Sequence, residues 1–101
     1  MNGTIPDFTW RAQMGFTRAE LLRALPRAVT PYEIRNTDVN PVEIVFDNHI
    51  VHLHTGPERL RVIASLKIPE LPVTLDFFGF DEIEFESFLS RFRRYLQKGG
   101  G

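Results

Sequence analysis

The stretch VEIVFDNHIVHL, residues 42–53, decides the fold, because apolar and polar residues alternate on both sides of a central Asp-Asn pair. Alternation with a period of two is typical of a strand with one buried face. Asp47 and Asn48 suit the two central positions of a tight hairpin turn. The register that this turn predicts places three pairs on one side of the sheet: Val42 with Leu53, Ile44 with Val51, and Phe46 with His49.

Two further turns extend this hairpin into a meander of four strands. A loop through residues 55–58 predicts a third strand beside the second, and a turn through residues 69–72, which holds two prolines, predicts a fourth beside the third. The apolar face continues through both new registers. The pairs that we expect there are Leu53 with Leu60, Val51 with Val62, His49 with Ala64, Ile68 with Val73, Leu66 with Leu75, and Ala64 with Phe77.

Two helix starts flank the meander. Thr17 is followed three residues later by Glu20, and Asp81 by Glu84, the spacing of a capping box. The first helix is expected to end or kink at Pro26, because proline removes an N–H from the helix interior and restricts the residue before it. The second has apolar residues at spacings of three and four and runs from Glu82 to about residue 98.

The remaining segments complete a single domain over residues 1–101. Residues 8–14 alternate and predict a strand before the first helix, and residues 27–41 predict a connector with at most a short extended piece at 32–35. The expected fold is therefore α+β, with an antiparallel sheet in β-α-β4-α order and both helices on one face. This element order resembles the TATA-box-binding-protein-like and helix-grip folds, a resemblance that implies topology and no residue-level function.

Composition excludes several classes of function. The chain has no cysteine, which rules out disulfides, thiolate metal sites and thiol catalysis. Its net charge of −1 disfavours nucleic acid as a partner. Without an apolar run of about 20 residues or a basic and apolar leader at residues 1–8, we expect no membrane partner and a cytoplasmic location.

An apolar row on the face away from the helices is the main candidate for function. In the registers above, Val45, Ile50, Ile63 and Phe78 lie side by side across all four strands. Contiguous apolar surface of this kind is typical of an interface, so the row predicts a homodimer or another protein partner. The alternative is that residues 27–41 fold over the row, or that it is too narrow to matter.

Two histidines offer a second candidate on the same face. His52 and His54 alternate along one strand, and Glu43 lies opposite one or the other of them. Two imidazoles and a carboxylate can bind zinc or iron. The simpler interpretation, which we prefer, is a cross-strand polar row in which His52 lies between Glu43 and Arg61. His49 is expected to face the core as a structural histidine.

The sequence therefore predicts a small non-enzymatic binding domain, with no catalytic residues, metal or cofactor assigned. Its open sheet face would serve self-association or partner docking. Two other functions stay open. One is binding of a small apolar ligand between the long final helix and the sheet, and the other is a carrier protein that is activated at the terminal Gly-Gly ending in Gly101.

Overall fold

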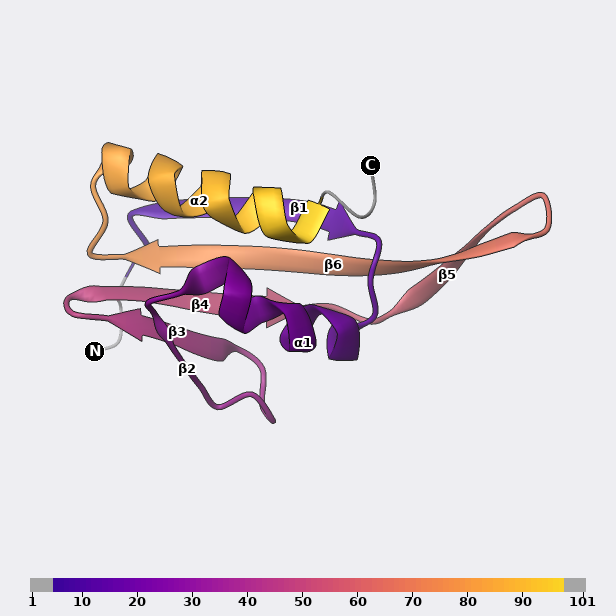
Figure 1. Cartoon of the computed structure of the whole chain (residues 1–101), viewed down its shortest axis with the longest axis horizontal. Helices are drawn as coiled ribbons and strands as arrows, with labels where there is room; N and C mark the ends of the chain where they lie inside the picture. Colours follow the sequence, from indigo (N-terminus) through magenta and orange to yellow (C-terminus); the bar gives the residue numbers. More distant parts are fainter. Residues whose placement is uncertain (1–4, 98–101) are drawn as a thin grey trace.

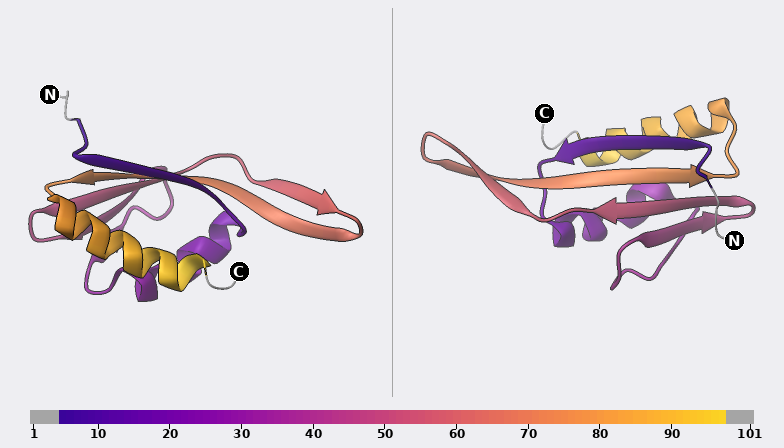
Figure 2. Two further views of the ribbon diagram at one scale, coloured as in Figure 1. Left: turned by 90° about the horizontal axis from the view of Figure 1, so that it is seen from above. Right: turned by 180° about the vertical axis from the view of Figure 1, so that it is seen from behind.

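One open antiparallel sheet carries two helices on a single face (Figures 1 and 2). The structure is a computed structural model that describes residues 5–97. The molecule is elongated, measuring 46 × 27 × 21 Å. Its elements, in chain order, are β1 (Phe8–Met14), α1 (Arg18–Val29), β2 (Glu33–Arg35), β3 (Val42–Phe46), β4 (His49–Thr55), β5 (Arg59–Ile63), β6 (Leu66–Phe78) and α2 (Glu82–Gln97).

The thirteen-residue β6 is the central strand of the sheet. The strand order is β1-β6-β4-β3-β2, and β5 pairs only with the first part of β6. β6 pairs with β1 from Leu71 onward and with β4 from Val73 onward, whereas before Leu71 it has β5 alone as a partner. The paired strands therefore continue beyond the body of the domain (Figure 1).

Both predicted helix starts are capping boxes. In α1 the backbone N–H of Glu20 donates to Thr17 Oγ1 at 3.1 Å, and the N–H of Thr17 donates back to Glu20 Oε1 at 2.9 Å. In α2 the same exchange joins Asp81 and Glu84 at 2.8 and 2.9 Å. These bonds satisfy N–H groups that a helix start otherwise leaves open.

The core lies between the two helices and one face of the sheet. Alternate residues of β1, β3, β4 and the second part of β6 point toward the helices and are buried or partly buried there. The fully buried side chains of this layer include Phe77, Phe92, Leu21, Leu25, Ile44, Leu53, Leu71 and Leu75. Aromatic rings join the layers, since Phe77 contacts Phe85 and Phe88 edge to face, with ring centroids 4.8 and 5.4 Å apart.

The predicted hairpin at residues 42–53 is confirmed in its register. Val42 lies opposite Leu53, Ile44 opposite Val51, and Phe46 opposite His49. The short extended piece expected at 32–35 is also present, as β2.

The two later registers of the predicted meander are wrong. The chain turns at Ala64 and Ser65, and β6 runs straight through residues 69–72, where a turn was expected. As a result β4 pairs with β6 and not with β5. Five strands, not four, lie between the helices, so the β-α-β4-α order and the topology that it implied are not confirmed. The apolar residues expected in the core at 60–68 lie outside it.

The turn expected at residues 69–72 was predicted from two prolines. The pairing of β6 with its neighbours explains why a strand tolerates them. Pro72 lies where β6 changes partner from β5 to β4, and its carbonyl accepts the N–H of Gly56 at 2.9 Å. Backbone groups of successive residues point to opposite edges of a strand. The missing N–H of Pro69 therefore falls on the other edge of β6, beyond the last pair with β1 at Leu71, where no ladder bond is needed.

Pro26 does not end the first helix, which continues to Val29. The helix ends at Thr30, whose N–H and side-chain hydroxyl both donate to the carbonyl of Pro26, at 3.1 and 2.7 Å. Ala28 and Val29 beyond the proline are buried, so packing of this last turn offsets the bond that the proline removes.

Candidate interaction surfaces

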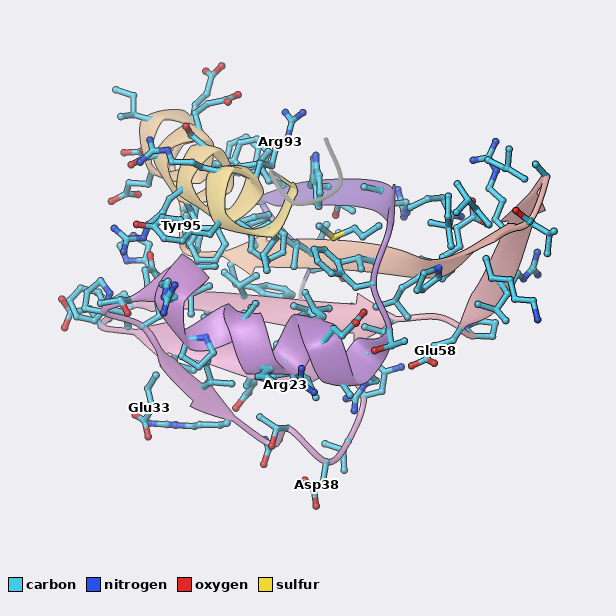
Figure 3. The ribbon with its side chains drawn as sticks, turned by 45° about the vertical axis from the view of Figure 1, so that its right-hand side comes forward. Arg23, Glu33, Asp38, Glu58, Arg93 and Tyr95 are labelled. Atoms are coloured by element: carbon cyan, nitrogen blue, oxygen red, sulfur yellow. The ribbon has the colours of Figure 1, made fainter. Side chains whose placement is uncertain are left out.

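A two-stranded arm projects from one end of the domain. It consists of β5, the turn at Ala64 and Ser65, and residues 66–70 of β6, and neither face of it is covered by another element (Figures 1 and 2). Side chains point outward from both of its sides (Figure 3). An isolated hairpin of this size buries little of its own surface.

Most of the exposed large apolar side chains of the described residues are on this arm. Leu60, Val62 and Leu66 are 63%, 62% and 63% exposed, and Ile63 and Ile68 are also exposed. Single exposed apolar residues are ordinary, but five on one projecting ribbon are typical of an interaction site. Ile63, Leu66 and Ile68 lie on one side of the ribbon, and Leu60 and Val62 lie on the other.

The arm is also basic. Arg59, Arg61 and Lys67 lie on it with a single carboxylate, that of Glu70. Arg61 Nη1 is 3.5 Å from Glu70 Oε2, and this Arg61 side chain is largely exposed. The pair is therefore weak in water and leaves the arm with an excess of positive charge.

The base of the arm is fixed to the domain. Glu58 lies there (Figure 3), and its carboxylate accepts the backbone N–H of Arg18, the first residue of α1, at 2.8 Å. Arg18 also donates from Nε to Thr55 Oγ1 at 3.1 Å. Asn40 bonds both the N–H and the carbonyl of Thr55, at 3.1 and 2.7 Å. The arm is thus presented from a hydrogen-bonded base.

The outer face of the sheet holds three of the four predicted interface residues. Val45 lies opposite Ile50, and Ile50 opposite Phe78, so these half-buried side chains form a row across β3, β4 and β6. Ile63 is not in this row, because it pairs with Leu66 beside the turn of the arm. Both helices lie on the opposite face, and the segment between α1 and β3 does not cross this one (Figure 2).

Two histidine–carboxylate pairs lie next to the row. His52 Nε2 is 3.6 Å from Glu43 Oε2, and His54 Nε2 is 3.2 Å from Asp76 Oδ2. Thr9 donates to the other oxygen of Asp76 at 2.8 Å. The polar row predicted here is present in part. Its expected third member, Arg61, lies on the arm, and the residue opposite His52 on the next strand is Asp76.

These histidines do not meet at one point. His52 and His54 have ring centroids 6.4 Å apart, and each faces a different carboxylate. No group of three or more potential metal ligands occurs within residues 5–97. The alternative of a metal held by His52, His54 and Glu43 is therefore not supported by this geometry.

A pocket of about 400 Å³ lies at the end of the domain away from the arm, between the end of α1 and the start of α2. We call it the end pocket. Its lining is part apolar and part polar, and comprises Ala28, Val29, Thr30, Pro31, Tyr32, His49, Ile83, Glu84, Ser87, Phe88 and Arg91.

His49 links the sheet to the long helix in this pocket. Its Nε2 is 3.1 Å from Glu84 Oε2, and its ring packs edge to face on Phe80 at 4.6 Å. Its buried Nδ1 has no hydrogen-bond partner. His49 is thus half-buried at the edge of the core. Its pairing with Glu84 was not predicted from the sequence, because the capping box alone accounted for that glutamate.

Glu84 also influences Tyr32. Burial of the phenol, and secondarily the negative charge of Glu84, raise the pKa of Tyr32 above its usual value of 10.0. On the other side of the pocket Arg91 Nη2 donates to the carbonyl of Arg27 at 3.3 Å, and its guanidinium lies 5.2 Å from the ring centre of Tyr95. The Nε of Arg91 is buried without a hydrogen-bond partner.

The layer between α2 and the sheet is filled by side chains. Phe77, Phe92 and Leu96 are fully buried there, and Phe88 and Leu89 nearly so. The expected site for an apolar ligand between this helix and the sheet thus coincides with the packed core, and ligand binding stays a prediction. The Gly-Gly of the carrier hypothesis, with Gly101, lies outside the described residues.

Neither of the described helices is long and apolar enough to cross a membrane. Comparison with protein-family models, with curated proteins and with solved structures finds no match for this chain. The surfaces described above therefore provide the argument about function.

Proposed function

We propose that this protein is a non-enzymatic interaction domain that binds another protein chain through its arm and the adjoining outer face of the sheet. The observation that carries the proposal is the arm itself, with five exposed large apolar side chains on a ribbon that nothing covers. A partner that covers these apolar side chains lowers the free energy by about 25 cal/mol for each Å² of apolar surface removed from water.

One side of the arm continues the outer face of the sheet. Even-numbered residues of β6 alternate onto the outer face, so the side of the strand that carries Phe78 and Asp76 also carries Ile68 and Leu66 on the arm. Ile63 belongs to the same side through its pair with Leu66. The predicted interface residues thus remain on one surface, although Ile63 lies far from the other three.

The mixture of residues on this surface also suits an interface. Apolar side chains at Val45, Ile50 and Phe78 lie beside the histidine–carboxylate pairs of the outer face. An apolar centre with a polar rim is the usual composition of a protein–protein contact. The homodimer and the cytoplasmic location expected from the sequence stay predictions.

Site-specific photo-crosslinking tests the proposal, because it captures whichever partner lies against a chosen position. A photoreactive amino acid is placed at Leu66 on the arm, at Arg11 on the outer face, or at Arg94 on the exposed side of α2 as the matched control. After irradiation of cells that make the protein, we expect protein adducts from Leu66 and Arg11 and none from Arg94. Irradiation that gives no adduct from Leu66 overturns the proposal.

A further inference from the structure

We infer that the partner of the arm is a second copy of this chain, bound arm to acidic end. The inference rests on the proposed function and names its partner. It starts from the end of the molecule that lies away from the arm, where α2 begins and β3 turns into β4 (Figure 1).

That end is strongly acidic. Five exposed carboxylates lie there, on the turn between β3 and β4 and on the first turns of α2, and we call this group the acidic end. They belong to Asp47, Asp81, Glu82, Glu84 and Glu86. The arm, at the opposite end, carries three basic side chains and one acidic one, so the two ends of the molecule have opposite charge. Opposite potentials on two surfaces steer their encounter and fix its orientation.

The acidic end also offers apolar contacts. Ile83 is 80% exposed at the edge of the end pocket, and Phe46, the last residue of β3, is also exposed. The apolar tip of the arm is formed by Ile63 and Leu66, which flank the turn. The end pocket, at about 400 Å³, has room for side chains of this size. The arm and the acidic end are therefore complementary in charge, and both carry exposed apolar side chains.

The arm of a molecule cannot contact the acidic end of the same molecule, because the two lie at opposite ends of its 46 Å length (Figure 1). A contact between two different patches gives a two-fold dimer in which each arm meets the end of the other copy, or it closes into a larger ring or grows into a chain. A symmetric contact between two arms would instead bring the arginines of both copies together. Like charges at such close range oppose pairing, so the arm-to-end contact is favoured.

Two variants that each lack one side of the contact test this directly. The arm variant is Val62→Asp with Leu66→Asp, and the end variant is Glu82→Lys with Ile83→Lys; all four side chains are exposed, so the fold should tolerate them. The matched control is Arg94→Glu. Circular dichroism and urea unfolding first establish that every variant is folded.

Sedimentation across a hundredfold range of concentration then gives the answer. We expect the wild type and the control to associate with increasing concentration, each variant alone to bind its like at least about tenfold more weakly, and an equimolar mixture of the two variants to form a dimer and nothing larger. Only a contact between two different patches is restored by mixing. A wild type that stays monomeric, or associates but whose two variants do not form a dimer on mixing, overturns the inference.

Charge reversal gives an independent check. Arg61→Glu with Lys67→Glu should abolish association, as should Glu82→Lys with Glu86→Lys, whereas all four changes in one chain should restore it. Loss that is not restored in the fourfold variant contradicts the pairing of these charges. The crosslinking above separates the two proposals: an adduct at Leu66 with another protein retains the proposed function and overturns this inference, and no adduct overturns both.

Discussion

His49 Nε2 lies 3.1 Å from Glu84 Oε2, and this contact joins the first residue of β4 to the first turn of α2. The same glutamate closes the capping box of α2 through its other oxygen, which accepts the N–H of Asp81. One side chain thus starts the helix and holds it against the sheet. Both residues line the end pocket.

Glu84→Ala should therefore destabilise the domain by roughly 1–2 kcal/mol, because it removes one half of a capping box and the partner of a half-buried histidine. Glu84→Gln should cost less, since an amide oxygen still accepts the N–H of Asp81. Urea unfolding measures both. Glu82→Ala, two residues earlier and exposed, is the control with a smaller expected loss, and equal losses in Glu84→Ala and Glu82→Ala would contradict the role assigned to the contact.

Phe92→Ala should cost about 3–5 kcal/mol of the free energy of unfolding. Phe92 is 0% exposed and its ring contacts Trp10 of β1 at 5.8 Å and Phe88 at 6.2 Å, so truncation leaves a cavity between helix and sheet. Val39→Ala, on the exposed connector, is the control for loss of an apolar side chain from the surface. A denaturation midpoint for Phe92→Ala close to that of the control would show that α2 does not pack as described.

Local signals in the sequence were sufficient for part of the fold. The register of β3 and β4 follows from two residues, Asp47 and Asn48, because a short turn between alternating segments leaves a single pairing that keeps one face apolar. The two capping boxes were equally local, since each depends on residues three positions apart. Such features do not depend on the rest of the chain.

Non-local features could not be predicted in this way. Pro69 and Pro72 favour a turn when read alone, and only the pairing partners on each edge of β6 show why a strand tolerates them. The apolar residues of the arm resemble core residues, because alternation indicates an apolar face and not what covers it. For the same reason the row of Val45, Ile50 and Phe78 was found, whereas Ile63 was misplaced when the register of its strand was wrong.

The candidate site at the end pocket was missed for a related reason. His49 and Glu84 are far apart in the chain, and each already had a local explanation in the sequence, the histidine as a core residue and the glutamate as a cap. No periodicity connects a strand start to a helix start across the sheet. Only the three-dimensional arrangement brings them together with Tyr32 and Arg91 around one cavity.

Ala64→Gly should stabilise the arm. Ala64 has a φ of 55° at the turn between β5 and β6, in the left-handed region that costs a residue with a Cβ roughly 1–2 kcal/mol and glycine very little. Part of this gain is offset by the greater freedom of glycine in the open arm, so a net gain of roughly 0.5–1 kcal/mol is expected. Hydrogen exchange of the arm amides measures it. Ser65→Gly, at the neighbouring position, is the control, and arm amides that exchange no more slowly in Ala64→Gly than in the control would contradict the strain assigned to Ala64.

Tyr32 should titrate above 10, because burial and, to a smaller extent, the charge of Glu84 raise its pKa. The folded protein then favours the protonated phenol, so this stabilising contribution is complete below pH 10 and is lost as the pH rises through the pKa of the folded state. Absorbance near 295 nm of the Tyr95→Phe variant, in which Tyr32 is the remaining tyrosine, follows the titration. In the Glu84→Gln background the pKa of Tyr32 should fall but stay raised, since burial is the larger cause. A phenol that titrates at 10 or below, or one whose pKa does not respond to Glu84→Gln, would show that Tyr32 does not sense the carboxylate at the mouth of the end pocket.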